Sequence, residues 1–173
     1  MSEPTPEHTN SAQVDDARYV EVDFDPFAGA AITAVIPTTE AQREVWLADQ
    51  LDPVASLAYN ESVTIALRGS IDTEAMRTAI KALTQRHDVL RAVLSRDGTE
   101  LLIQQDAGQA LIVDDLSNLP EDEADATLTS LVAGESANAF DLVNGPLFRA
   151  RLISLTANEH ALVLGAHHIV CDG

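Results

Sequence analysis

The sequence is poor in cysteine, and this limits the chemistry available to it. Cys171 is the only cysteine among the 173 residues, so no disulfide can form within the chain, and a reducing cytoplasm is the expected setting. Cys171 lies next to two histidines, which raises the question of a cysteine nucleophile. Because no approach of a base to its thiol can be read from the sequence, a small packed residue is the favoured interpretation.

Basic residues are also scarce. Lys and Arg number 10 against 28 Asp and Glu, which gives a formal net charge of −18. Eleven acids and no basic residue lie between Arg96 and Arg149. Such a surface repels phosphates and argues against nucleic acid binding. A solvated acidic surface is the simpler interpretation of that stretch, and a docking surface for a basic partner is the alternative.

Long apolar runs and aromatic residues are few. No stretch approaches the roughly 18 apolar residues of a membrane span, and the acidic first 30 residues do not resemble a signal peptide. We therefore expect no membrane association. Hydrophobic residues make up 46% of the chain and aromatic residues 4%, which predicts one domain with a mainly aliphatic core.

The remaining patterns predict a layered α/β (α+β) domain. Helices are expected from Thr38 or Thr39 to about Gln50, from Asp72 to about Arg86, and from Glu121 to about Asn138. Strands are expected over Asn60–Arg68, Val89–Ser95, Glu100–Gln104, Ala110–Val113, Leu147–Leu155 and from His160 onward. An Asp97-Gly98 turn predicts a hairpin between the second and third strands. Alternation of Val63, Ile65 and Leu67 with smaller residues predicts that the first strand has one buried face.

The first 36 residues form an acidic leader that is expected to be partly disordered. Within it, Tyr19 to Phe27 alternates apolar and acidic residues and predicts either an edge strand or a segment that orders against a partner. The leader is a candidate docking segment, and the folded domain is expected over residues 37–173.

Residues 167–173 read His-His-Ile-Val-Cys-Asp-Gly and follow an apolar strand. Adjacent strand residues point to opposite faces, so His167 and His168 are poorly placed to share a metal ion. Two interpretations of the histidine pair are equally supported on physical grounds. His167 could be a buried histidine bonded to backbone, with His168 incidental. Alternatively, one histidine could act in acid–base or positioning work on acyl transfer, with Asp172 fixing the local geometry.

A family resemblance favours the second interpretation. Residues 167–173 fit the HHxxxDG signature of condensation domains of nonribosomal peptide synthetases, in the chloramphenicol-acetyltransferase-like superfamily. Upstream, residues 39–47, 86–91 and 140–149 resemble further motifs of that family in the same order. Glu44 and Thr39 depart mildly from the first of these motifs. The resemblance covers about Pro37 to Gly173.

The resemblance implies amide formation between an acyl or peptidyl thioester on one carrier protein and an aminoacyl amine on another, both held on phosphopantetheine arms. His168 would be the key catalytic residue and His167 a supporting one. Because an α-amino group has a pKa of about 7.7, alignment of the amine could matter more than removal of its proton. Asp172 would pair with Arg86 or Arg91, and the Gly173 amide could lie near the reacting atoms.

The resemblance also implies partners and alternatives. Upstream and downstream carrier proteins and an adenylation domain are the expected partners, with no directly bound cofactor or metal. Family domains are about two and a half times longer, so the chain is expected to hold the N-terminal lobe of a longer synthetase and to be inactive alone. An epimerisation domain, a freestanding acyltransferase and an inactive lobe that serves only as a docking fragment are the alternatives.

Overall fold

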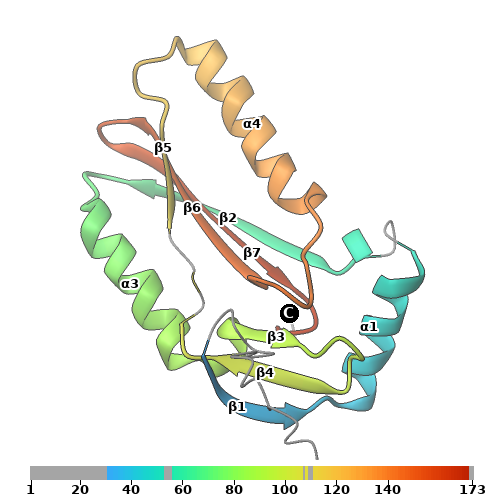
Figure 1. Ribbon diagram of the computed structural model, residues 1–173. Coiled ribbons are helices and arrows are strands. Elements are labelled where there is room, and N and C mark those ends of the chain that lie inside the picture. Colours follow the sequence, from blue (N-terminus) through green and yellow to red (C-terminus); the bar gives the residue numbers. More distant parts are fainter. Residues whose placement is uncertain (1–30, 53–55, 107, 109–110, 172–173) are drawn as a thin grey trace, which may run out of the picture.

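The computed structural model describes residues 31–52, 56–106, 108 and 111–171, and Figure 1 shows their arrangement. The elements are β1 (Ile32–Pro37), α1 (Glu40–Leu51), β2 (Asn60–Arg68), α3 (Thr73–Arg86), the 3₁₀ helix η1 (Asp88–Arg91), β3 (Ala92–Leu94), β4 (Glu100–Gln104), β5 (Ile112–Asp115), α4 (Glu121–Ala137), β6 (Phe148–Thr156) and β7 (Glu159–His167). The expected α/β class is confirmed.

The helices begin where the sequence supplies caps. Thr39 and Gln42 form a reciprocal capping box at the start of α1, and the Asp72 side chain accepts hydrogen bonds from two backbone amides of α3. Three acids occupy the first turn of α4, where they face the positive end of the helix dipole. All three helices predicted from the sequence are present within one or two residues of the expected bounds.

The strands form two sheets. The larger has the order β2-β7-β6-β5, in which β7 pairs antiparallel with both neighbours and β5 runs parallel to β6. Helices α3 and α4 pack on opposite faces of this sheet, one against Phe148 and Leu152 and the other against Ile153 and Val163. The smaller sheet has the order β1-β4-β3.

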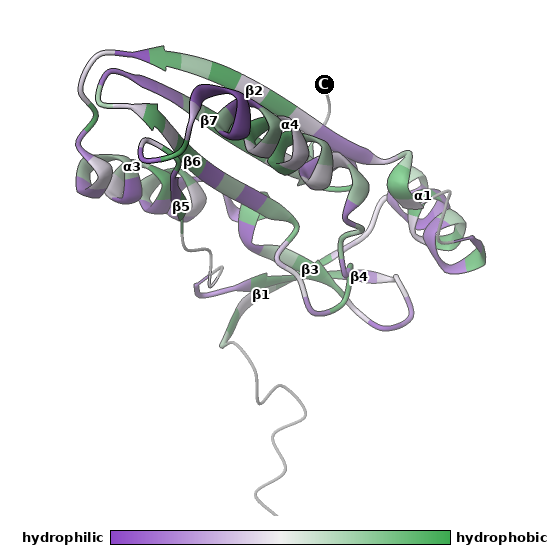
Figure 2. Cartoon of the chain, turned by 90° about the horizontal axis from the view of Figure 1, so that it is seen from above, coloured by the Kyte–Doolittle hydropathy of each residue, from purple (hydrophilic) through white to green (hydrophobic). Residues whose placement is uncertain are grey.

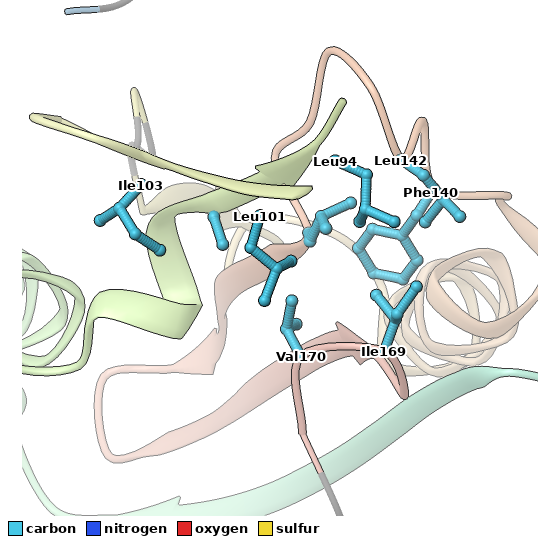
Figure 3. Packing of buried hydrophobic residues seen from close by; sticks show 9 residues of the cluster. Leu94, Leu101, Ile103, Phe140, Leu142, Ile169 and Val170 are labelled. Carbon is cyan, nitrogen blue, oxygen red and sulfur yellow. The ribbon is translucent and has the colours of Figure 1, made fainter. Parts of the chain in front are cut away.

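The smaller sheet carries the core that holds the C-terminal motif. Leu94, Leu101 and Ile103 from β3 and β4 pack in one cluster with Phe140 and with Ile169 and Val170 of the motif (Figure 3). Each of these side chains is less than 10% exposed. The two middle residues of the histidine motif are therefore structural anchors, and the predominantly aliphatic core agrees with the composition.

Three local expectations require correction. Strand β1 was not anticipated, although it pairs along β4 and belongs to the smaller sheet. The segment expected as one strand over Val89–Ser95 starts as the 3₁₀ helix η1, and only Ala92–Leu94 pair with β4 in the expected hairpin. Strand β5 lies two residues later than expected, because its register with β6 begins at Ile112.

The prediction that one face of β2 is buried is wrong for most of the strand. Val63 is 51% and Ile65 is 40% exposed, and only Leu67 packs against the α3 cluster. More and less hydrophobic residues alternate along this strand, as the colours of Figure 2 show, but β2 is an edge strand and α3 covers only its Arg68 end. Periodicity reveals that a strand has two faces, whereas coverage of a face depends on neighbouring elements.

The acidic leader falls almost entirely on residues 1–30, outside the described residues, and its disorder, the Tyr19–Phe27 segment and its docking role stay predictions. Residues 32–36, placed in the leader by the sequence analysis, belong to β1. Within the part of the chain that the structure describes, no helix is long and apolar enough to cross a membrane.

Candidate active site at the histidine turn

The two histidines lie where β7 ends and the chain turns. His167 is the last residue of β7, and the turn that follows is closed by a hydrogen bond from Val170 N to His167 O at 3.0 Å. His167 N donates to Leu147 O at 3.0 Å, and His168 N donates to Tyr59 O at 2.8 Å. Backbone bonds to two separate segments therefore hold the turn, in addition to the buried anchors Ile169 and Val170.

His167 is fully buried, with 0% of its surface exposed. Its Nδ1 accepts a hydrogen bond from Ile169 N at 3.2 Å, so the neutral ring carries its proton on Nε2. Burial lowers the pKa of His167 to about 4, against a weaker opposing effect from Asp49. The ring packs 6.0 Å from those of Tyr59 and Phe140. A neutral, enclosed imidazole of this kind supports the turn and is poorly suited to exchanging protons with a substrate.

His168 faces the other way. Its side chain is 42% exposed, and its Nδ1 lies 3.7 Å from Glu61 Oε1 on β2. The expectation that neighbouring histidines diverge is thus confirmed, because His167 enters the core and His168 reaches the surface. His168 is thus the exposed histidine of the pair.

An open hollow of about 220 Å³ lies beside this turn. Its apolar lining comes from Val63, Phe148, Leu164 and Ala166, and Glu61 and Cys171 also line it. These residues lie on the α3 face of the larger sheet, beyond the end that α3 covers. The hollow therefore offers an apolar surface beside Glu61, the side chain that also lies next to His168.

Gln42 is a site residue to which the sequence analysis gave no role. Its Nε2 donates to Ile169 O at 3.0 Å, and its Oε1 accepts from Thr39 N at 3.0 Å. One side chain therefore caps α1 and ties that helix to the histidine turn. The capping-box spacing was visible in the sequence, but a contact across 127 positions was not.

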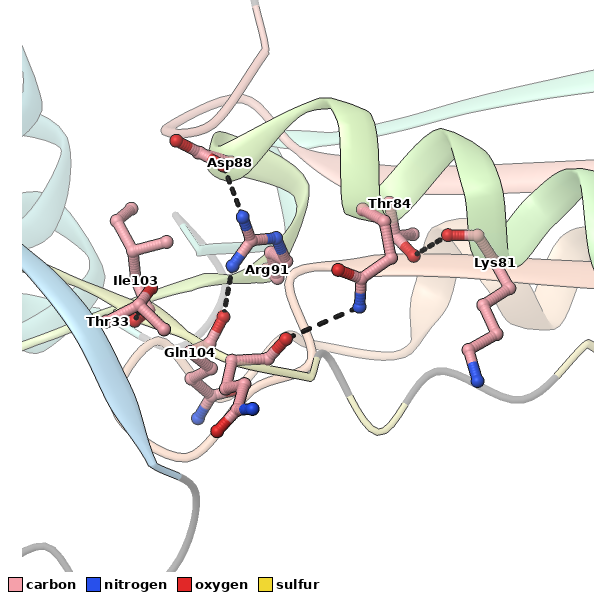
Figure 4. Close-up of polar contacts among 9 residues, drawn as sticks. Thr33, Lys81, Thr84, Asp88, Arg91, Ile103 and Gln104 are labelled. Carbon is pink, nitrogen blue, oxygen red and sulfur yellow. Dashed lines mark hydrogen bonds and ion pairs between the residues drawn. The ribbon is translucent and has the colours of Figure 1, made fainter.

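The predicted supporting residues have the following surroundings. Arg86 is exposed at the end of α3. The Arg91 guanidinium contacts the Asp88 carboxylate and donates to Gln104 O, as Figure 4 shows. Asp172 and Gly173 lie outside the described residues, so the pairing of Asp172 with either arginine and the role of the Gly173 amide stay predictions.

The remaining candidate chemistry concerns Cys171 and metals. Cys171 is partly exposed, and its Sγ lies 3.5 Å from His167 O. This contact fits a small residue packed against the turn. Among the described residues, no group of three or more His, Cys, Asp and Glu is arranged to hold a metal ion.

Comparison with known proteins gives the site a family context. A model of the condensation domain matches residues 32–173. The chain is 38% identical over 140 residues to phosphinothricin tripeptide synthetase PhsC of Streptomyces viridochromogenes, which covers 80% of this chain and 13% of that protein. It is 35% identical over 163 residues to an isonitrile lipopeptide synthase of Mycobacterium tuberculosis, which covers 94% of this chain and 6% of that protein.

Solved structures agree with the sequence relatives. The starter condensation domain of the rhizomide synthetase RzmA is similar with a TM-score of 0.72 and 26% identity, over 82% of this chain and 34% of that one. The chain therefore spans about a third of that structure and a small fraction of the synthetases that it matches. The family match and these relatives show that the chain belongs to the condensation domain family of nonribosomal peptide synthetases.

Proposed function

We propose that this chain supplies the N-terminal lobe of a condensation domain that joins a carrier-bound acyl or peptidyl thioester to a carrier-bound aminoacyl amine. The observation that carries the proposal is the placement of His168. It is an exposed imidazole on a rigidly held turn, beside an apolar hollow. A thioester and an amine brought together there would react through attack of the amine nitrogen on the thioester carbon, with release of the carrier thiol.

Each site residue has a separate role in this proposal. His168 aligns the amine and can accept a proton from it as the amide bond forms. His167, held neutral by burial, fixes the turn through its backbone and ring contacts. Gln42 and Tyr59 hold the same turn from α1 and from the segment before β2. Asp172, Gly173, Arg86 and Arg91 keep their proposed supporting roles.

The partners follow from the same proposal. Phosphopantetheine arms on upstream and downstream carrier proteins would bring both substrates as thioesters, and an adenylation domain of the same synthetase would load the acceptor. The apolar lining of the hollow fits the acyl end of such a substrate. We place this synthetase in the cytoplasm, as expected from the sequence.

We expect the 173-residue chain alone to be inactive. It covers 34% of the solved rhizomide synthetase domain chain, so a second lobe would have to complete the walls around His168. Activity is therefore to be measured in the complete condensation domain that contains this lobe.

The test is His168→Ala in the complete domain, with donor thioester and aminoacyl acceptor loaded on their carriers and the amide product quantified by mass spectrometry. Loss of a positioned proton acceptor typically costs ~100-fold or more in rate. The control is Glu159→Ala, an exposed residue at the far end of the β2–β7 ladder, which is expected to retain activity. A folded His168→Ala domain, judged by thermal melting, that still formed amide at the wild-type rate would contradict the proposal.

A further inference from the structure

Among the described residues, Glu61 is the acidic side chain that forms an ion-pair contact with His168. Its Oε1 lies 3.7 Å from His168 Nδ1, and the two side chains are 55% and 42% exposed. Glu61 sits opposite Ala166 in the register of β2 with β7, so its side chain shares the face of the sheet on which the hollow lies. Glu61 thus both lines the hollow and lies beside the imidazole of His168.

The backbone holds this pair in register. His168 N donates to Tyr59 O at 2.8 Å, two residues before Glu61, and the ladder of β2 with β7 continues without a break from Asn60 opposite His167. The 3.7 Å separation is longer than the ~2.7–3.2 Å of a hydrogen bond, so a bond between the two groups requires these partly exposed side chains to approach further.

We propose that Glu61 is a positioning residue that orients the His168 ring by accepting a hydrogen bond from Nδ1–H. A neutral imidazole carries one proton, and the nitrogen that holds it donates while the other accepts. With Nδ1–H directed at Glu61, Nε2 is left unprotonated and faces away from the carboxylate. Nε2 is then the atom that accepts the proton of the attacking amine. This inference rests on the proposed function of His168 and adds the group that selects its tautomer.

The first readout is the tautomer itself. The 173-residue chain is labelled with ¹⁵N-histidine and studied by NMR. The ring-nitrogen signals of His168 are those that disappear in the His168→Ala variant. The wild type is expected to carry the proton on Nδ1, and Glu61→Ala to move toward a mixture of both tautomers. Glu61→Gln retains an oxygen that can accept from Nδ1–H and is expected to preserve most of the wild-type tautomer.

The second readout is the rate in the complete domain. Glu61→Ala is expected to lower kcat for amide formation about tenfold with KM little changed, because the ring is misoriented while the surfaces that bind substrate are intact. Glu61→Gln should recover most of that loss. Glu159→Gln and Glu159→Ala, which make the same changes at the other end of the same ladder, are the matched controls.

The outcomes separate the two proposals. If His168→Ala abolishes amide formation while Glu61→Ala behaves like Glu159→Ala in both readouts, the role of Glu61 is overturned and the proposed function stands. A rise in KM with an unchanged tautomer would also overturn it, since Glu61 would then act on the substrate. If His168→Ala retains activity, the proposed function fails, whatever the tautomer shows.

Discussion

Strands β2 and β7 pair over nine consecutive positions and yet have opposite environments. Most side chains of β7 are buried, whereas most of β2 are exposed. The difference arises because β7 has a neighbour on both sides and helices on both faces, while β2 is the edge of the sheet. Hydrogen bonding along a ladder therefore does not determine burial. The buried strand β7 leads directly into the histidine turn, and the exposed strand β2 carries Glu61, which lies beside His168.

The largest expected change in the free energy of unfolding comes from shortening, one at a time, two side chains that face each other across β2 and β7. Leu162 of β7 is 8% exposed and lies opposite Ile65 of β2, which is 40% exposed. Leu162→Ala should lower the free energy of unfolding by about 3 kcal/mol, through lost burial and a residual cavity. Ile65→Ala should cost under about 1 kcal/mol. Chemical denaturation of both variants measures the contrast, and equal losses would mean that β2 is covered in solution.

A smaller effect concerns the charge of His167 at the end of β7. The unfolded state binds this proton near the ordinary pKa of about 6.5, and the folded state only near a pKa of about 4. Between these values acid favours unfolding, so stability falls as pH falls. The expected loss from this group between about pH 7 and pH 5 is ~2 kcal/mol.

Denaturation of His167→Gln at both pH values checks this expectation. The variant should lose less stability on acidification than the wild type, even if it is less stable at neutral pH. His87→Gln, the same change at an exposed position after α3, should keep the wild-type pH dependence. An unchanged pH dependence in His167→Gln would show that the ring is solvated.

The smallest effect tests how α1 contributes to the end of β7. Gln42→Glu keeps a residue that can complete the capping box, but it replaces the donor to Ile169 O with a carboxylate. We expect a loss of about 1 kcal/mol in stability and a larger relative loss of amide formation in the complete domain. Thr39→Ala, which removes the cap and leaves the Ile169 contact, should lose a similar stability but retain more activity. If Thr39→Ala instead lost more activity than Gln42→Glu, Gln42 would act only by capping α1.

Much of the fold was predictable from local patterns. The helices followed from capping residues and 3.6-residue periodicity, and the long strands β6 and β7 from apolar runs between turns. Strand β1 was missed because Ile32–Pro37 has no clear alternation and is formed by pairing with β4. The start of η1 was missed because a short apolar run does not distinguish a strand from a helical turn.

The site was predictable in part. The sequence indicated the two histidines, their opposite orientations and the packing of the motif at the end of a strand. It gave no indication that Gln42 and Tyr59 contact the turn or that Glu61 faces His168. These contacts join residues separated by more than 100 positions. No local pattern encodes such a contact, because it depends on how the sheets and α1 pack together.

The sequence by itself determined the three helices, most of the strands, the acidic surface, the aliphatic core and the motif, since each depends on residue identity and near-neighbour spacing. The tertiary structure alone decided which histidine is enclosed and which is open, that β2 is an edge strand, and that Glu61 approaches the exposed imidazole. The physical reason is that burial and electrostatic contact are properties of groups brought together in space. Two adjacent residues of the same type therefore differ in environment: His167 is enclosed and neutral, whereas His168 is exposed.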